Sequence, residues 1–176
     1  MNDGVDQMRA SLQGYEEEDL REAIELLFFA YRDFTGEADT VLANFGFGRA
    51  HHRAIYFIAR NPGIFVSDLL GILKITKQSL SRVLTQLIKE GYVRHQIDKT
   101  DRRRRLLELS QKGEDLERQL TARQCTRIIK AFEAAGVGSI SGFHSILREM
   151  IDPADQDRVN QHVNYLSKDD KRRLAG

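Results

Sequence analysis

The chain of 176 residues is close to the usual size of one domain, which is enough to bury a core. Hydrophobic residues make up 41% and charged residues 30%, with 13 glycines and two prolines, a composition that excludes collagen-like and most disordered proteins and favours a helical globular one. The single cysteine excludes an internal disulfide, and no apolar run approaches the length of a membrane span. We therefore expect a soluble cytoplasmic protein that does not enter a membrane.

The formal net charge of +1 averages two segments of opposite charge. Residues 1–40 contain eleven acids and three arginines, a net charge of −8. Residues 74–105 contain ten bases and three acids, a net charge of +7. Because a basic segment attracts polyanions, the second stretch is a candidate surface for nucleic acid.

The N-terminal part of the chain divides into two stretches. Residues 1–15 show no sustained periodicity, and we expect a flexible acidic segment there. In residues 16–48, apolar side chains recur at the i, i+3, i+4 and i+7 spacing of a long amphipathic helix, which needs a partner surface. These apolar residues are Leu20, Ile24, Leu27, Phe28, Tyr31 and Phe34.

Residues 49–110 carry the order of elements that is typical of a winged helix-turn-helix domain. A helix is predicted from about Arg49 to Arg60, and two short helices in tandem follow, the first capped by Ser67 and the second by Thr76. Two strands are then predicted over residues 92–97 and 105–109, joined by a charged loop. The fold class is therefore mainly α, with a three-helix core and a two-stranded β wing.

Two further helices are predicted in residues 111–168, before a polar tail at residues 169–176. The first begins after Ser110 and ends near Ala135, with inward-facing apolar residues, and the second covers residues 140–151. Pro153 is expected to bend or restart the chain into a final helix near residues 154–166. The inward-facing residues of the first helix are expected to be Leu116, Leu120, Ile128 and Phe132.

The second tandem helix and the wing provide the candidate contacts to double-stranded DNA. Short polar side chains and one guanidinium lie early in this helix, with no acid before Glu90, so its exposed face is suited to the major groove. Gln78, Ser79 and Arg82 are expected to contact bases, and Ser67, Thr76, Lys77 and Lys89 to contact phosphates, with Ser81 on the same helix. Asp101 in the wing would orient a neighbouring arginine, and one of the wing arginines would enter the minor groove. The wing residues expected to contribute are Lys99, Asp101, Arg102, Arg103 and Arg104.

These residues resemble the MarR family of bacterial winged-helix regulators. The resemblance rests on residues 67–70, 76–84, 87–93, 101–103 and 107–113. It implies a homodimer whose two winged domains bind a short inverted repeat, often with a small ligand between the two lobes, and it places Asp101, Arg102 and Arg103 at the family's wing Asp-Arg and adjacent basic positions. One departure is Lys74, which stands where a helix-turn-helix usually has glycine in its turn.

The flanking helices agree with dimerisation, because they carry more apolar residues than the small wing domain is able to cover. Residues 16–48 and 111–168 are therefore expected to form a dimerisation lobe around the DNA-binding domain at residues 49–110. The expected function is a dimeric, sequence-specific transcriptional regulator, most simply a repressor, with a small effector of unknown identity.

Three alternatives remain open at this point. His51 and His52 invite a metal or haem site, although adjacent helical residues point about 100° apart, and a metal is not predicted. Cys125, with Arg123 and Arg127 nearby, is a candidate redox sensor, although an inert cysteine is expected. The third alternative is a winged helix that binds only an acidic protein partner. An enzyme is not expected, because the chain has none of the common catalytic motifs.

Overall fold

The computed structural model describes residues 14–97, 105–157 and 159–160. The chain divides into two compact units, Met1–Arg49 and Ala50–Gly176. The first contains helix α2 (Glu17–Ala43). The second contains helices α3 (Arg49–Arg60, starting at the unit boundary), α4 (Val66–Leu73), α5 (Lys77–Lys89), α6 (Gln111–Ala135) and α7 (Ser139–Glu149), and strands β1 (Ile64–Phe65), β2 (Val93–Ile97) and β3 (Arg105–Leu109).

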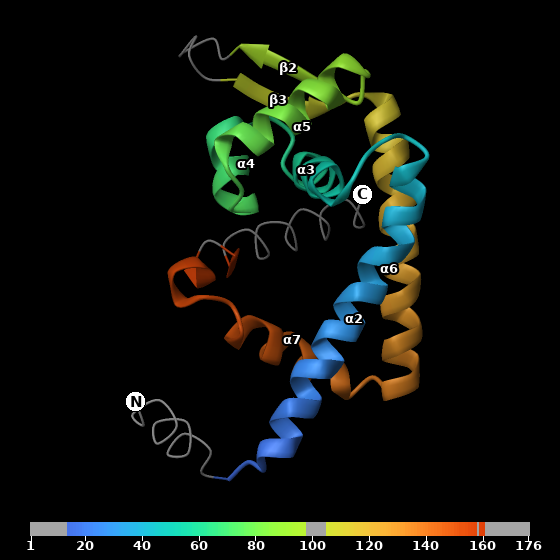
Figure 1. Ribbon diagram of the computed structural model, residues 1–176, viewed down its shortest axis with the longest axis vertical. Helices are drawn as coiled ribbons and strands as arrows, with labels where there is room; N and C mark the ends of the chain where they lie inside the picture. The colour runs from blue at the N-terminus through green and yellow to red at the C-terminus, as the bar shows by residue number, and fades with distance from the viewer. Residues whose placement is uncertain (1–13, 98–104, 158, 161–176) are drawn as a thin grey trace, which may run out of the picture. The chain divides into compact units, whose positions relative to one another are not determined.

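Helices α3, α4 and α5 gather beside the β2–β3 hairpin, and α6 leads away from them (Figure 1). The winged helix-turn-helix predicted from the sequence is confirmed. The fully buried side chains that join its three helices include Ile55 and Ile58 of α3, Leu69 of α4 and Leu87 of α5, each 0% exposed. Burial of this size is the main source of stability for such a small unit.

The turn between α4 and α5 is the tight connection that gives the motif its name. Lys74 ends α4 in the left-handed conformation, with φ 48° and ψ 39°. Thr76 then begins α5 as predicted, because its hydroxyl oxygen accepts a hydrogen bond from the backbone N–H of Ser79 over 3.1 Å. The prediction that Ser67 caps α4 is wrong: Phe65 occupies the N-cap position, and Ser67 lies inside the first turn.

The wing is part of a three-stranded antiparallel sheet in the order β1-β3-β2. The predicted hairpin pairs Val93 with Leu109 and Ile97 with Arg105. The short strand β1 was not expected from the sequence, and it pairs Ile64 with Leu107 on the other side of β3. Because β1 directly precedes α4, this pairing joins the start of the helix-turn-helix to strand β3 of the wing.

A compact junction joins the hairpin to α6. Ser110 caps α6 by accepting a hydrogen bond from the N–H of Gly113 over 3.1 Å, and its own hydroxyl donates to the carbonyl of Gly91 over 2.6 Å. The ammonium of Lys112 lies 4.1 Å from the centroid of the Tyr92 ring. These contacts fix where the long helix α6 leaves the winged domain.

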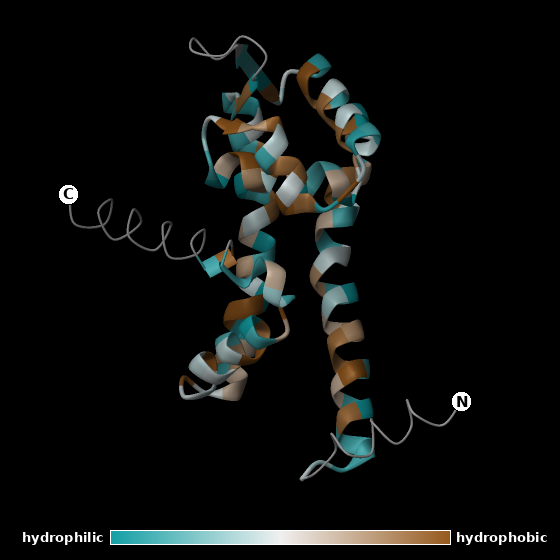
Figure 2. Ribbon diagram, turned by 90° about the vertical axis from the view of Figure 1, so that its left-hand side faces the viewer, coloured by the Kyte–Doolittle hydropathy of each residue, from teal (hydrophilic) through white to brown (hydrophobic). Residues whose placement is uncertain are grey.

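Helix α2 has two halves of different character. Its last turns bury Thr35, Ala38, Val41 and Leu42, whereas every side chain from 21 to 30 is exposed. Figure 2 shows apolar residues recurring along this exposed half. The exposed large apolar side chains of α2 are Ile24, Leu26, Leu27, Phe28, Phe29 and Tyr31.

The C-terminal helices also leave apolar side chains exposed. Leu116 and Leu120 of α6 are buried as predicted, whereas Ile128 and Phe132 are only half-buried. Helix α7 buries none of its residues. Within the described part of the chain, none of the helices has the combination of length and apolarity that a membrane span requires.

We predict that Gly113→Ala destabilises the winged domain. A Cβ atom at this position would lie 2.2 Å from the backbone oxygen of Tyr92, so the junction has to shift. The free energy of unfolding should fall by about 1–3 kcal/mol, measured by chemical denaturation.

The matched control is Gly142→Ala in α7, where a new Cβ atom meets nothing within 4 Å. It should leave stability unchanged or raise it by up to about 1 kcal/mol. Equal effects of the two substitutions would contradict the close packing at the junction.

Candidate nucleic-acid interface

Helix α5 presents one polar face to solvent. Leu80, Val83, Leu84 and Leu87 are buried on its other side. These four positions fix the rotation of the helix about its axis, since their spacing places them on one face. The side chains left exposed are Lys77, Gln78, Ser79, Ser81, Arg82, Thr85 and Lys89.

The N-terminus of α5 combines the cap with a hydroxyl pair. The Thr76 hydroxyl donates to the Ser79 hydroxyl oxygen over 2.8 Å while it accepts from the Ser79 N–H. Both side chains are exposed. The remaining free amides of this first turn, together with the positive end of the helix dipole, are suited to a phosphate oxygen.

Ser67 lies apart from α5 in sequence, on the first turn of α4. It is exposed, and its hydroxyl lies 3.3 Å from the carboxylate of Asp68, to which it donates. The neighbouring negative charge disfavours a close phosphate contact at this hydroxyl. The surroundings of Ser67 are therefore unfavourable to this role.

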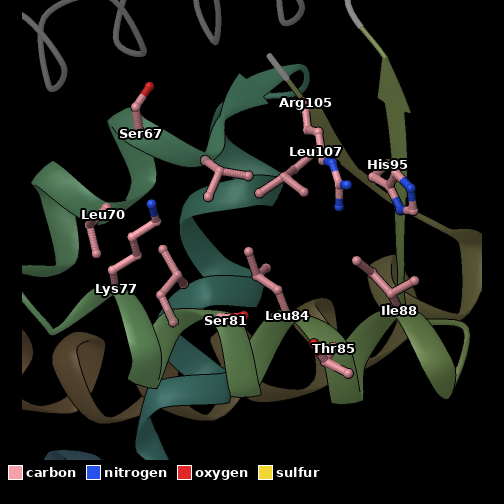
Figure 3. A pocket seen from close by; sticks show the side chains of 12 residues that line it. Ser67, Leu70, Lys77, Ser81, Leu84, Thr85, Ile88, His95, Arg105 and Leu107 are labelled. Carbon is pink, nitrogen blue, oxygen red and sulfur yellow. The ribbon is translucent and has the colours of Figure 1, made fainter. Parts of the chain in front are cut away.

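A hollow of about 470 Å³ lies between α4, α5 and the hairpin (Figure 3). Leucine and isoleucine side chains form much of its wall, and Lys77 extends from α5 toward α4, while Arg105 and His95 extend from the two strands. Its polar lining residues are Ser67, Lys77, Ser81, Thr85, His95 and Arg105. The structure thus brings three predicted residues together with three that sequence reasoning did not assign to DNA binding.

The alternation of side chains along the two predicted strands was a sequence signal that could have pointed to His95 and Arg105. Strand residues two apart share a face, and the register pairs His95 with Leu107, so His95, Arg105 and Leu107 lie on the same face of the hairpin. Thr85 follows from Ser81 by one helical turn. Arg94, also basic, instead donates to the carbonyl of Leu109 over 3.2 Å and supports the hairpin.

The predicted wing contacts lie outside the described residues. These are Lys99, Asp101, Arg102, Arg103 and Arg104.

The structure describes His51, His52 and Cys125, the residues considered as alternative sensors. The His51 Nε2 lies 3.0 Å from Gln86 Oε1, and the Gln86 amide donates to Glu90 Oε1 over 3.0 Å, so His51 connects α3 to α5. No three or more His, Cys, Asp or Glu side chains among the described residues, which include His52, are grouped to hold a metal ion. Cys125 is exposed on α6.

Comparisons with known proteins point to one family. Residues 45–104 match the model of the MarR family. The chain is 48% identical over 150 residues to the HTH-type transcriptional regulator PetP of Rhodobacter capsulatus, an alignment that covers 85% of this chain and 88% of that protein.

Solved structures share the fold. FabT of Streptococcus pneumoniae in complex with DNA superposes with a TM-score of 0.67 at 18% identity, covering 74% of this chain and 94% of that one. The multiple antibiotic-resistance repressor of Listeria monocytogenes gives a TM-score of 0.51 at 28% identity, covering 86% of this chain and 97% of that one. With the exposed polar face of α5 and the close relative in Rhodobacter, these findings establish that the chain belongs to the MarR family of helix-turn-helix transcriptional regulators, which bind DNA and are not enzymes.

Proposed function

We propose that the protein is a dimeric repressor that occupies an inverted repeat in promoter DNA, with one α5 helix of each copy in the major groove. The observation that carries this proposal is the exposed face of α5, which has cations and short polar groups and no acid before Glu90. Chromosomal DNA as the target implies action in the cytoplasm. The repressor role is supported by the name of the Listeria relative in fold.

The side chains of α5 divide into two classes in this proposal. Gln78, Ser79 and Arg82 contact base edges, where an arginine is able to donate two hydrogen bonds to guanine. Thr76 and Lys77 at the start of the helix, and Lys89 at its end, contact phosphates, with Ser67 as a weaker contributor. Ser81 lies between the two classes on the same exposed face.

The wing completes the contacts in the proposal. Arg102, Arg103 and Arg104 would lie along the minor groove beside Lys99, and Asp101 would orient one of the arginines. Arg105, the first residue of β3, pairs with Ile97 at the loop end of the hairpin and continues this basic stretch into the described part of the wing.

The dimer is supported by the exposed apolar side chains of the flanking segments. On α2, Ile24 is 69% and Phe28 63% exposed, and on α7, Ile146 is 63% exposed. Large apolar side chains left exposed on a helix mark an interface, and a two-fold axis is the commonest way to cover them with a second copy. We therefore assign residues 16–48 and 111–168 to a dimerisation lobe and residues 49–110 to DNA binding.

Two-fold symmetry also explains why an inverted repeat is the expected target. Paired recognition helices contact half-sites about 34 Å apart, one turn of DNA. A small effector that binds one spacing of the two helices better than another would shift the population between DNA-binding and released states.

We predict different effects for two substitutions on α5. Arg82→Ala removes a base contact, so it should weaken binding to a duplex selected from a random pool by about 1–3 kcal/mol while leaving binding to random DNA nearly unchanged. Lys77→Ala removes a phosphate contact, so it should weaken binding to both duplexes equally. Titration of labelled duplexes at two salt concentrations measures both effects, and Lys77→Ala should reduce the salt dependence.

A control variant, Glu108→Gln, changes the charge of a residue on β3 outside the proposed contacts. Its neighbour is the amide of Gln96 at 3.5 Å, and little change in DNA binding is expected. Equal losses on selected and random DNA for Arg82→Ala would overturn the assignment of this residue to base contact.

We also predict that the combined substitutions Ile24→Asp and Phe28→Asp convert the dimer to a monomer. Two carboxylates in a buried apolar interface carry a large desolvation penalty. Sedimentation velocity should show half the mass of the unsubstituted protein, and affinity for the selected duplex should fall. The matched control, Glu22→Gln with Glu25→Gln on the same exposed turns, should remain dimeric. A monomeric unsubstituted protein at micromolar concentration would refute the dimer.

A further inference from the structure

The turn between α4 and α5 contains an unusual backbone conformation. Lys74, at φ 48°, is the one non-glycine residue with positive φ among residues 14–97, 105–157 and 159–160. Glycine adopts this left-handed region without a steric penalty, whereas a lysine does not, because its Cβ atom crowds the following carbonyl. A non-glycine residue at a strained position is a reason to ask what its side chain contacts.

The Lys74 side chain connects two distant parts of the chain. Its ammonium forms an ion pair with the carboxylate of Asp155, 81 residues further along. The Asp155 side chain is only 22% exposed, while that of Lys74 is 59% exposed. The anion is therefore held largely out of solvent, and the cation reaches it from the helix-turn-helix.

The segment that carries Asp155 is itself fastened. Asp152 Oδ1 accepts a hydrogen bond from the N–H of Ala154 over 2.9 Å, so Asp152 caps the helical turn that begins at Pro153. Arg148 of α7 donates to Asn160 Oδ1 over 2.5 Å. The carboxylate of Asp155 thus belongs to an ordered turn directly after α7.

The other end of the ion pair lies at the start of the recognition helix. The N–H of Lys74 donates to the carbonyl of Leu70 over 3.1 Å, which closes α4. Thr76, two residues later, caps α5. A displacement of Lys74 therefore acts directly on the first turn of α5, where the proposed phosphate and base contacts begin.

We propose that Lys74 is a positioning residue: its ion pair with Asp155 couples the segment after α7 to the N-terminus of α5. This inference rests on the proposed function, in which α5 contacts DNA and the C-terminal helices form the dimer. A recognition helix held in one orientation loses less conformational freedom when it binds, so the pair favours DNA binding. It also provides a path by which a change in the C-terminal segment reaches the DNA-binding surface.

The first test measures amide hydrogen exchange of the free protein by mass spectrometry. Asp155→Asn removes the anion and leaves the turn sequence intact, and Lys74→Gly removes the cation while keeping a residue that accepts positive φ. Each variant should exchange about two- to fivefold faster in both residues 74–79 and residues 151–157, the range expected for a part-exposed ion pair. The control Asp157→Asn, which changes an exposed carboxylate in the same segment, should not alter exchange.

Exchange that rises only in residues 151–157 of Asp155→Asn, or in neither segment, would overturn the coupling. The charge exchange Lys74→Asp with Asp155→Lys should restore slow exchange, because aspartate tolerates the left-handed conformation better than most residues.

The second test measures affinity for the selected duplex, well below the unfolding temperature of every variant. Each single substitution should weaken binding about two- to fivefold, and the double variant Lys74→Gly with Asp155→Asn should be no weaker than either one. The positioning role would be refuted if the affinity loss of the double variant equalled the product of the two single losses. Unchanged affinity with Asp155→Asn would refute it as well. A purely structural pair would lower the unfolding temperature without changing this affinity. If the unsubstituted protein shows no sequence preference, the proposed function fails, while the exchange measurement still decides whether the two segments are coupled.

Discussion

The burial of one face of α5 is the constraint on which the rest of the DNA-binding surface depends. Leu80 and Leu87 are at most 1% exposed, and Val83 and Leu84 are 6% exposed. With these side chains in the core, the helix has one allowed rotation, and the polar residues between them have to face solvent. The candidate contacts to DNA are therefore a consequence of core packing, because the same leucines that stabilise the motif orient Gln78 and Arg82 outward.

Around this helix, backbone pairing and close contacts hold the wing and the start of α6 at defined places. Strand β3 pairs with both β1 and β2, so the hairpin is joined to the segment that precedes α4. At the other end, Ser110 and Gly113 bring the start of α6 against Gly91 and Tyr92. Small residues and a hydroxyl at this junction permit a close approach of two backbones that a larger side chain would prevent.

Sequence reasoning predicted the elements whose signals are local. The Thr76 cap, the start of the long helix after Ser110 and the period of the leucines in α5 each involve residues within one or two helical turns of each other. It failed for β1, because a two-residue strand has no periodicity of its own, and for the cap of α4, because Ser67 was favoured by residue type where Phe65 has the cap geometry. The Lys74–Asp155 contact spans 81 residues and depends on the path of the chain after α7, so no local pattern could reveal it.

The surface left exposed by a single copy connects the fold to its function. In the proposed function, a second copy would cover the exposed apolar residues on α2 and α7. Two identical recognition helices would then contact the two halves of one site, so that one short helix in each copy would suffice. The most direct test of this account is selection of bound duplexes from a random DNA pool, with measurement of the protein-to-DNA ratio in the resulting complex. We expect an enriched inverted repeat bound by two chains, at least about a thousandfold more tightly than a scrambled duplex. A single half-site bound by one chain, or no enrichment over random DNA, would contradict it.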